Sequence, residues 1–226
     1  IADVHVSDFW GSYVVEMKLP ATMELVPGFP PYALLLTNLF VASWSDDGLE
    51  WTYCTQVAFL DADGTGATEM LPETDAALGE TPLYLSTADG LGIEEQSIAW
   101  TWGIQGMEDP FNDSLPSDPE DPLVWDQDED GNPGVTVEVL IPKGFRHMVR
   151  RAVWNIHPPE IISGGQRFEG STGFKVDENA LGYDGDPLLL TLVDIVPDPN
   201  GGTYTMVRTD EYYSCEQLLA EYPGIF

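Results

Sequence analysis

The segment from residue 33 to residue 60 constrains the fold more than any other part of the chain. Ala33 to Trp44 is almost wholly apolar, and Leu49 to Leu60 mixes aromatic, β-branched and small polar residues around the turn sequence Ser45-Asp46-Asp47-Gly48. Two such runs on either side of an Asp-Gly turn are typical of a β-hairpin. Strict alternation in the second arm would place Trp51, Tyr53, Thr55 and Val57 on one face and Thr52, Cys54 and Gln56 on the other.

Similar strand patterns recur along the chain, in residues 1–20 (ended by Pro20), 82–87, 96–104, 135–141, 145–156, 166–174, 188–196 and 203–209. Near the end, Ser214 with Gln217 three residues later forms a capping box, which predicts a short helix through Tyr222. We therefore expect an all-β protein, either an antiparallel barrel of lipocalin-like shape or a sandwich, with a short C-terminal helix.

A long acidic loop marks the middle of the sequence. Residues 105–134 are rich in Asp, Pro and Gly and show no apolar periodicity. Loops of that length inside a compact domain are functional or mobile. We expect a single domain, residues 1–226; the alternative is two β-rich halves, 1–104 and 135–226, joined by this loop. The sequence contains no apolar run of eighteen residues, so no transmembrane helix is predicted.

The charge distribution is extreme. The formal net charge is −31, and no Lys, Arg or His occurs between Lys18 and Lys143. Such a surface repels nucleic acid and anionic membranes and attracts divalent cations and basic partners. Arg146, Arg150 and Arg151 are, with Lys143, the cations nearest in sequence to the acidic loop. We expect these arginines to pair with the loop or its neighbours; the alternative is a binding site for an anionic ligand.

Within the acidic loop, Asp126, Asp128 and Asp130 alternate and are followed by Gly131. Alternate residues of a tight loop can direct carboxylates at one point, and Ca²⁺ prefers six to eight oxygen ligands. The pattern predicts a calcium site. A solvated acidic linker is the alternative.

The predicted site departs from an EF-hand. The twelfth position is Val137 instead of Glu, and Pro133 with the following Val-Thr-Val favours a strand after the loop. We expect Asn132 and Glu138 to complete the ligand set, with Asp118, Glu120 and Asp121 as other sources of the last ligand. A shorter loop, Asp61-Ala62-Asp63-Gly64, is either a second metal loop through Asp61 and Asp63 or a plain turn.

The two cysteines, Cys54 and Cys215, have no zinc-type spacing. A calcium loop and strong acidity both indicate a location outside the cytoplasm, where cysteines are oxidised. We therefore expect the two cysteines to form a disulfide that closes a loop of about 160 residues; two buried free thiols are the alternative. We expect a secreted, cell-surface or periplasmic protein whose targeting segment is not part of this sequence.

Catalytic motifs are absent from the sequence, which has no G-x-S-x-G, P-loop or dinucleotide signature, and its three histidines lack zinc spacing. Trp100 and Trp102 lie two residues apart, on one face of a strand, and we expect the pair to pack in the core. The alternative is that they stack on a sugar, together with Trp125. Because the sequence lacks catalytic motifs, we expect a protein without enzymatic activity.

The stretch DQDEDGNPGVTVEV, with the β-rich segments that follow and the late SCEQLLAEY, resembles uncharacterised secreted or lipid-anchored bacterial proteins. Those proteins carry a D-x-D-x-D-G-x-P-G-V-T loop, and the resemblance is confined to the C-terminal half. It implies an extracytoplasmic location and no particular activity. The leading prediction is a calcium-binding structural or binding protein, such as a component of a cell-surface assembly that contacts other surface proteins, itself or polysaccharide. A calcium-stabilised carbohydrate-binding module is the alternative, and a hydrolase comes third.

Overall fold

The computed structural model describes residues 5–24, 31–60, 65–89, 92–140, 143–190, 194–198 and 201–226. The fold is the predicted one, a mostly antiparallel β structure with a short C-terminal helix. In the part of the chain that the structure describes, the largest sheet contains twelve strands. The predicted second metal loop, Asp61 to Gly64, lies outside the described residues.

The elements follow the chain in this order: η1 (Val6–Phe9), β1 (Gly11–Glu24), β2 (Tyr32–Ser45), β3 (Gly48–Leu60), β4 (Thr65–Met70), α1 (Pro72–Gly79), β5 (Leu83–Leu85), β6 (Thr87–Ala88), β7 (Gly92–Ile93), β8 (Gln96–Trp102), β9 (Val135–Leu140), β10 (Lys143–Ile156), β11 (Glu160–Ile162), β12 (Arg167–Gly185), η2 (Pro187–Leu190), β13 (Asp194–Pro197), β14 (Gly202–Thr209) and α2 (Cys215–Glu221). The longest described helix, α1, has eight residues, which is far short of the length that a bilayer span requires.

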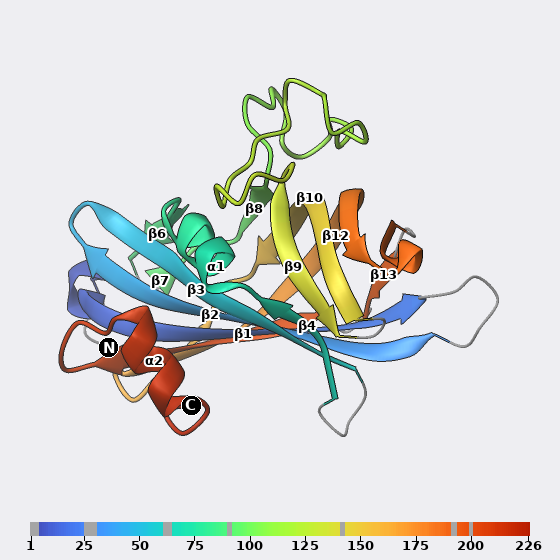
Figure 1. Cartoon of the computed structure of the whole chain (residues 1–226). Coiled ribbons are helices and arrows are strands. Elements are labelled where there is room, and N and C mark those ends of the chain that lie inside the picture. The colour runs from blue at the N-terminus through green and yellow to red at the C-terminus, as the bar shows by residue number, and fades with distance from the viewer. Residues whose placement is uncertain are drawn as a thin grey trace.

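Strand β12 closes the sheet into a ring. Its first part, Arg167–Thr172, pairs with β14, and its remainder, Thr172–Gly185, pairs with β10. The hydrogen-bonded order β12–β14–β1–β2–β3–β4–β9–β10 therefore returns to β12. Figure 1 shows β9, β10 and β12 crossing steeply over the layer of β1, β2 and β3. The result is a barrel of two crossing layers with the core between them.

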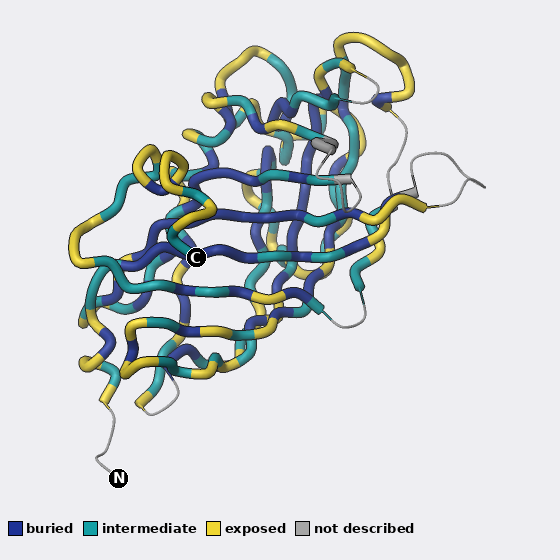
Figure 2. Tube along the Cα trace, turned by 90° about the horizontal axis from the view of Figure 1, so that it is seen from below, coloured by how far each residue is buried: buried dark blue, intermediate teal, exposed yellow. Residues whose placement is uncertain are grey.

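The core is rich in aromatic side chains. The rings of Trp100 and Trp102 lie 5.1 Å apart and Trp100 also contacts Tyr53 at 4.8 Å. Trp100 is 4% exposed and Trp102 1% exposed, so both rings point into the barrel and pack the core as expected, and the sugar-stacking alternative does not hold for this pair. Trp125, in the acidic loop, is 39% exposed. Figure 2 shows burial concentrated along the middle of the long strands and exposure at many of the turns.

Helix α2 covers the outer face of the layer formed by β1, β2 and β3. Leu218 packs there in a small apolar cluster with Val14, Leu39 and Val41. The predicted disulfide is confirmed: Cys54 and Cys215 are joined, with their Cα atoms 5.1 Å apart and a sequence separation of 161. The capping box is confirmed as well, because the Ser214 hydroxyl accepts from the Gln217 backbone N–H at 3.2 Å and the Gln217 side chain accepts from that of Ser214 at 2.9 Å.

A β-bulge in β3 corrects the predicted faces of the hairpin. Leu39 pairs with Thr55 and the next residue, Phe40, pairs with Tyr53, so Cys54 is the extra residue. One extra residue reverses the alternation. Trp51 and Tyr53 therefore face the core together with Ala58, while Cys54 faces α2.

Three further segments differ from the sequence prediction. The first strand is preceded by the 3-10 helix η1 and runs through Pro20, because the missing N–H of Pro20 falls between the residues that pair with β14 and those that pair with β13. The predicted strand 188–196 is instead η2 followed by β13. Helix α1, which begins with a proline in its first turn, was not predicted.

Candidate metal centre

The acidic loop leaves the barrel at the end of β8 and returns at the start of β9, and Figure 1 shows it rising above the barrel wall. Its two ends run side by side. The Trp125 N–H donates to the Gly103 carbonyl at 3.1 Å, the Gln105 N–H to the Leu123 carbonyl at 2.9 Å, and Ile104 pairs with Val124. The base of the loop is thereby fixed to the barrel.

The far part of the loop rests on β10 and β12. The Arg151 guanidinium donates to the Asp113 carbonyl at 2.6 Å and to the Asp177 carboxylate at 2.8 Å, and the Asn179 amide donates to the Pro116 carbonyl at 3.0 Å. Arg151 therefore binds the acidic loop as predicted. Arg146 and Arg150 do not: residues of β10 alternate between its two faces, and these two side chains point into the barrel.

Asp126, Asp128 and Asp130 converge. One carboxylate oxygen from each lies within 4.8 Å of those of the other two. The Asp126 carboxylate accepts from the Asp130 N–H at 3.1 Å and from the Gly131 N–H at 2.9 Å, which curls the loop around it. The alternate spacing read from the sequence thus brings the three side chains to one place.

Asp128 is the buried member of the triad, at 8% exposed. Its Oδ2 accepts from the Thr136 N–H at 2.8 Å and lies 2.7 Å from the hydroxyl of Thr74 on α1. Its Oδ1 is buried and has no hydrogen-bond partner among the residues that the structure describes. Burial raises the pKa of Asp128 against these donors, and the neighbouring Asp130 raises it further. A buried carboxylate oxygen without a donor calls for a cation or a proton.

Asp130 belongs to a chain of hydrogen bonds that reaches into β10. The Thr136 hydroxyl lies 2.5 Å from Asp130 Oδ2 and 2.8 Å from Nδ1 of His147, which is buried. Because an ionised carboxylate only accepts, the hydroxyl donates to Asp130 and accepts from the imidazole, which places a proton on Nδ1. Burial tends to raise the pKa of Asp130, but the hydrogen bonds from Thr136 and Asn132 outweigh burial and lower it.

Gly134 closes the loop. Its N–H donates to the Trp125 carbonyl at 3.1 Å, and its carbonyl accepts from the Gln127 N–H at 2.9 Å. Its φ is +89°, and a Cβ at this position would lie 2.2 Å from the Met148 carbonyl oxygen of β10. Only glycine lets the loop lie this close to the barrel wall.

The remaining predicted ligands lie around the triad or away from it. The Asn132 amide donates to Asp130 Oδ2 at 3.1 Å, so this side chain adjoins the triad. Glu138 lies farther along β9, with Oε1 3.4 Å from the Lys143 ammonium. The carboxylates of Asp118 and Asp121 each accept a hydrogen bond from the backbone N–H two residues later and so stabilise turns. Among the described residues, the triad alone is a cluster of three or more potential metal ligands.

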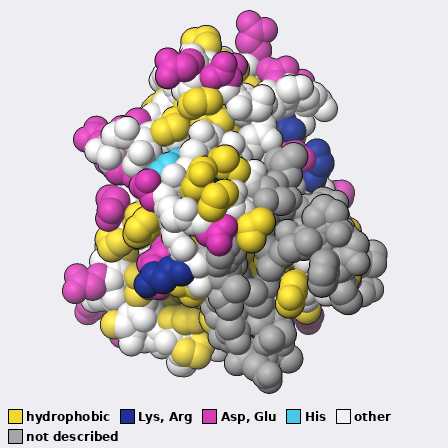
Figure 3. Space-filling view, turned by 45° about the vertical axis from the view of Figure 1, so that its right-hand side comes forward, with side chains coloured by type: hydrophobic (Ala, Val, Ile, Leu, Met, Phe, Trp, Pro, Cys, Tyr) yellow, Lys and Arg dark blue, Asp and Glu magenta, His cyan; other side chains and the backbone are white. Residues whose placement is uncertain are grey.

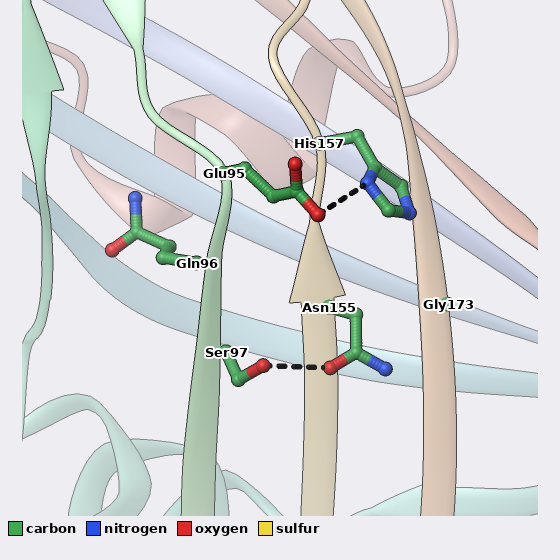
Figure 4. A pocket seen from close by; sticks show the side chains of 6 residues that line it. All are labelled: Glu95, Gln96, Ser97, Asn155, His157 and Gly173. Carbon is green, nitrogen blue, oxygen red and sulfur yellow. Dashed lines mark hydrogen bonds and ion pairs between the residues drawn. The ribbon is translucent and has the colours of Figure 1, made fainter.

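A shallow polar hollow lies elsewhere, on the outer surface of β8, β10 and β12 (Figure 4). There the Ser97 hydroxyl donates to Asn155 Oδ1 at 2.8 Å, and Nδ1 of His157 lies 3.8 Å from a Glu95 carboxylate oxygen. The described residues that line it include no Phe, Tyr or Trp side chain on which a sugar could stack. Figure 3 shows acidic side chains scattered over the visible face of the protein and only a few basic ones.

No protein-family model, no curated protein and no solved structure matches this chain. The resemblance to secreted or lipid-anchored bacterial proteins stays a prediction. Any functional conclusion therefore depends on the geometry of the chain's own residues.

Proposed function

We propose that the loop from Asp126 to Asn132 binds one Ca²⁺ and that the protein is a non-enzymatic, extracytoplasmic structural or binding protein. The observation that carries this proposal is Asp128: a buried carboxylate with one oxygen that lacks a donor among the described residues, beside two further carboxylates. Three negative charges at such short separation repel one another, and a divalent cation at their centre offsets that repulsion.

The chemistry of the donors favours calcium. The triad supplies oxygen ligands only, which suits a hard cation and not zinc. Ca²⁺ accepts irregular arrangements of six to eight oxygens, whereas Mg²⁺ demands a near-ideal octahedron. Asp126, Asp128 and Asp130 are the proposed ligands, Asn132 and Glu138 are further candidates, and backbone carbonyls or water would complete the shell.

The proposed role of the cation is structural. Asp128 already connects three elements, because Thr74 belongs to α1, Thr136 to β9 and Asp128 itself to the loop. A cation on the free oxygen of Asp128 would hold this junction together. It would also order the loop that rises above the barrel, where a partner of a cell-surface assembly, a second copy of the chain or a polysaccharide could bind.

The disulfide supports the proposed location. Disulfides persist in oxidising compartments, and millimolar calcium is available outside the cytoplasm. A net charge of −31 is easier to maintain where divalent cations are abundant.

A carbohydrate-binding module is the second candidate, and Trp125 favours it. Its side chain is 39% exposed and directly precedes the triad, so its ring could stack on a sugar beside the proposed cation. Saturable quenching of tryptophan fluorescence by an oligosaccharide, lost in Trp125→Phe and kept in Trp10→Phe, would support this function. Trp10 is the matched control because it is 41% exposed.

Isothermal titration of the metal-free protein tests the calcium proposal directly. We expect one Ca²⁺ per chain, a much weaker response to Mg²⁺, loss of the calcium heat in Asp128→Asn and its retention in Glu129→Gln. The Glu129→Gln variant removes one charge from the same loop without touching the triad. If Ca²⁺ and Mg²⁺ give the same weak heats and Asp128→Asn behaves like the parent, the loop is an acidic linker and the proposal fails.

A further inference from the structure

Two arginines lie inside the barrel. Arg146 and Arg150 lie on the face of β10 that also carries the core residue Met148, and each is 6% exposed. Arg146 donates to the Glu178 carboxylate of β12 at 2.8 Å. Arg150 donates to the side-chain oxygen Oε1 of Gln56 at 2.8 Å and stacks over the Trp102 ring at 4.6 Å. Among the described residues, no carboxylate lies within salt-bridge distance of Arg150.

Most of the hydrogen-bonding capacity left over around these arginines consists of donors; the buried Tyr53 hydroxyl, which lies near Arg150, can accept as well as donate. Nε and Nη2 of Arg146, Nε of Arg150 and Nδ2 of Asn38 are buried and have no partner among the described residues. The Gln56 side chain cannot serve them, because its oxygen already accepts from Arg150 and its amide donates to Asn38 Oδ1 at 2.7 Å. Asn38, fully buried on β2, faces the same interior from the opposite layer.

The charges of this interior group point the same way. Two guanidinium groups face one carboxylate, Glu178, so the group carries one excess positive charge in a protein of net charge −31. An unpaired buried charge is strongly unfavourable unless a counter-charge joins it. Burial lowers the pKa of Arg150, with Glu178 as the largest opposing influence and Arg146 adding to the lowering. A negatively charged hydrogen-bond acceptor would satisfy the unpartnered donors and neutralise the excess charge.

We propose that Arg150, together with Arg146 and Asn38, binds one small anion inside the barrel, of the size of a halide or a single carboxylate group. The N–H groups of the two guanidinium side chains and of the Asn38 amide supply the hydrogen bonds, and the anion neutralises the excess charge. The site is independent of the proposed calcium loop, which uses other residues and the opposite charge.

Thermal melts over a series of anion concentrations test the proposal. Sodium chloride, bromide and formate are each titrated against the parent, Arg150→Met and the control Arg167→Met, whose guanidinium is about one third exposed and pairs with Glu169 on the surface. Screening of the surface charge and general salt effects are shared by all three proteins. We expect a gain in stability in the parent and in Arg167→Met that is lost in Arg150→Met, with the folding equilibrium constant rising about tenfold for each tenfold increase in anion above its Kd.

A second measurement does not depend on a variant that folds. Crystals of the unaltered protein grown in sodium bromide should show one anomalous bromine peak inside the barrel, in contact with Arg150 Nε. If no such peak is present and the melts of the parent and of Arg150→Met respond alike to every anion, ordered water satisfies these donors and the proposal is wrong. A bromine peak confined to the surface would overturn it as well.

Discussion

Replacing Asp128 by asparagine should have opposite consequences with and without calcium. Asparagine keeps an oxygen that can accept from the Thr136 N–H and the Thr74 hydroxyl, so the two hydrogen bonds of the parent survive. The substitution also removes the negative charge of the Asp128 carboxyl, a group whose pKa is raised by burial. Metal-free Asp128→Asn should therefore be as stable as the metal-free parent, or slightly more stable.

With calcium the order should reverse. A ligand at one hundred times its Kd stabilises the folded state by about 2.7 kcal/mol. For a chain of this size each kcal/mol moves Tm by about 2–4 °C, so saturating Ca²⁺ should raise the parent by about 5–11 °C and the variant hardly at all.

Differential scanning calorimetry of the parent, Asp128→Asn and Glu129→Gln, each with chelator and with millimolar Ca²⁺, measures both effects at once. Glu129→Gln should follow the parent in both conditions. Equal losses of stability for Asp128→Asn with and without calcium would mean that Asp128 acts only through its hydrogen bonds, and the reasoning above would be refuted.

Three more predictions concern the barrel. The double variant Cys54→Ala/Cys215→Ala should lose on the order of 4–5 kcal/mol of stability in guanidinium unfolding, because the disulfide joins residues with a sequence separation of 161, and an unchanged midpoint would contradict this expectation. Burial raises the pKa of Asp75 to about 6 from its ordinary 3.8, so between these two pH values the folded state keeps a proton that the unfolded state has released. The stability of the parent should therefore fall as pH rises through that window. In urea unfolding, Asp75→Asn should be more stable than the parent by on the order of 2 kcal/mol at pH 7.5 and equally stable below pH 3.8. Gly134→Ala and Gly131→Ala share a φ of +89°, but only the first places a Cβ against the Met148 carbonyl, so Gly134→Ala should destabilise the protein by several kcal/mol and Gly131→Ala by about 1 kcal/mol in the same assay.

Features set by neighbouring residues were predictable from the sequence. The capping box of Ser214 and Gln217, the hairpin around Asp46-Asp47 and the convergence of the three aspartates each depend on a few consecutive residues, and the structure contains all three. The disulfide could be predicted only from an argument about the cellular compartment, because the spacing of the two cysteines in sequence does not show that they lie close together.

Features set by distant residues were not predictable in the same way. The bulge at Cys54 reverses the faces of β3, and nothing in the local alternation signals it. The role of Arg150 depends on Gln56 and Trp102, which come from other strands, whereas proximity in sequence suggested the acidic loop. Thr74, the donor from α1 to Asp128, is separated from it by 54 residues and belongs to a helix that no apolar periodicity announces.

The pairing of β1 with β14 has a consequence for how the chain reaches this fold. Ser12 lies opposite Thr209, so the ring stays open until the chain has been made as far as β14. Contacts between residues so far apart in sequence form slowly, and until they form β1 exposes an unpaired edge. Cys215 lies beyond β14, so the disulfide to Cys54 also waits for the C-terminal segment. During biosynthesis, loss of the free thiols should therefore report that the barrel has closed.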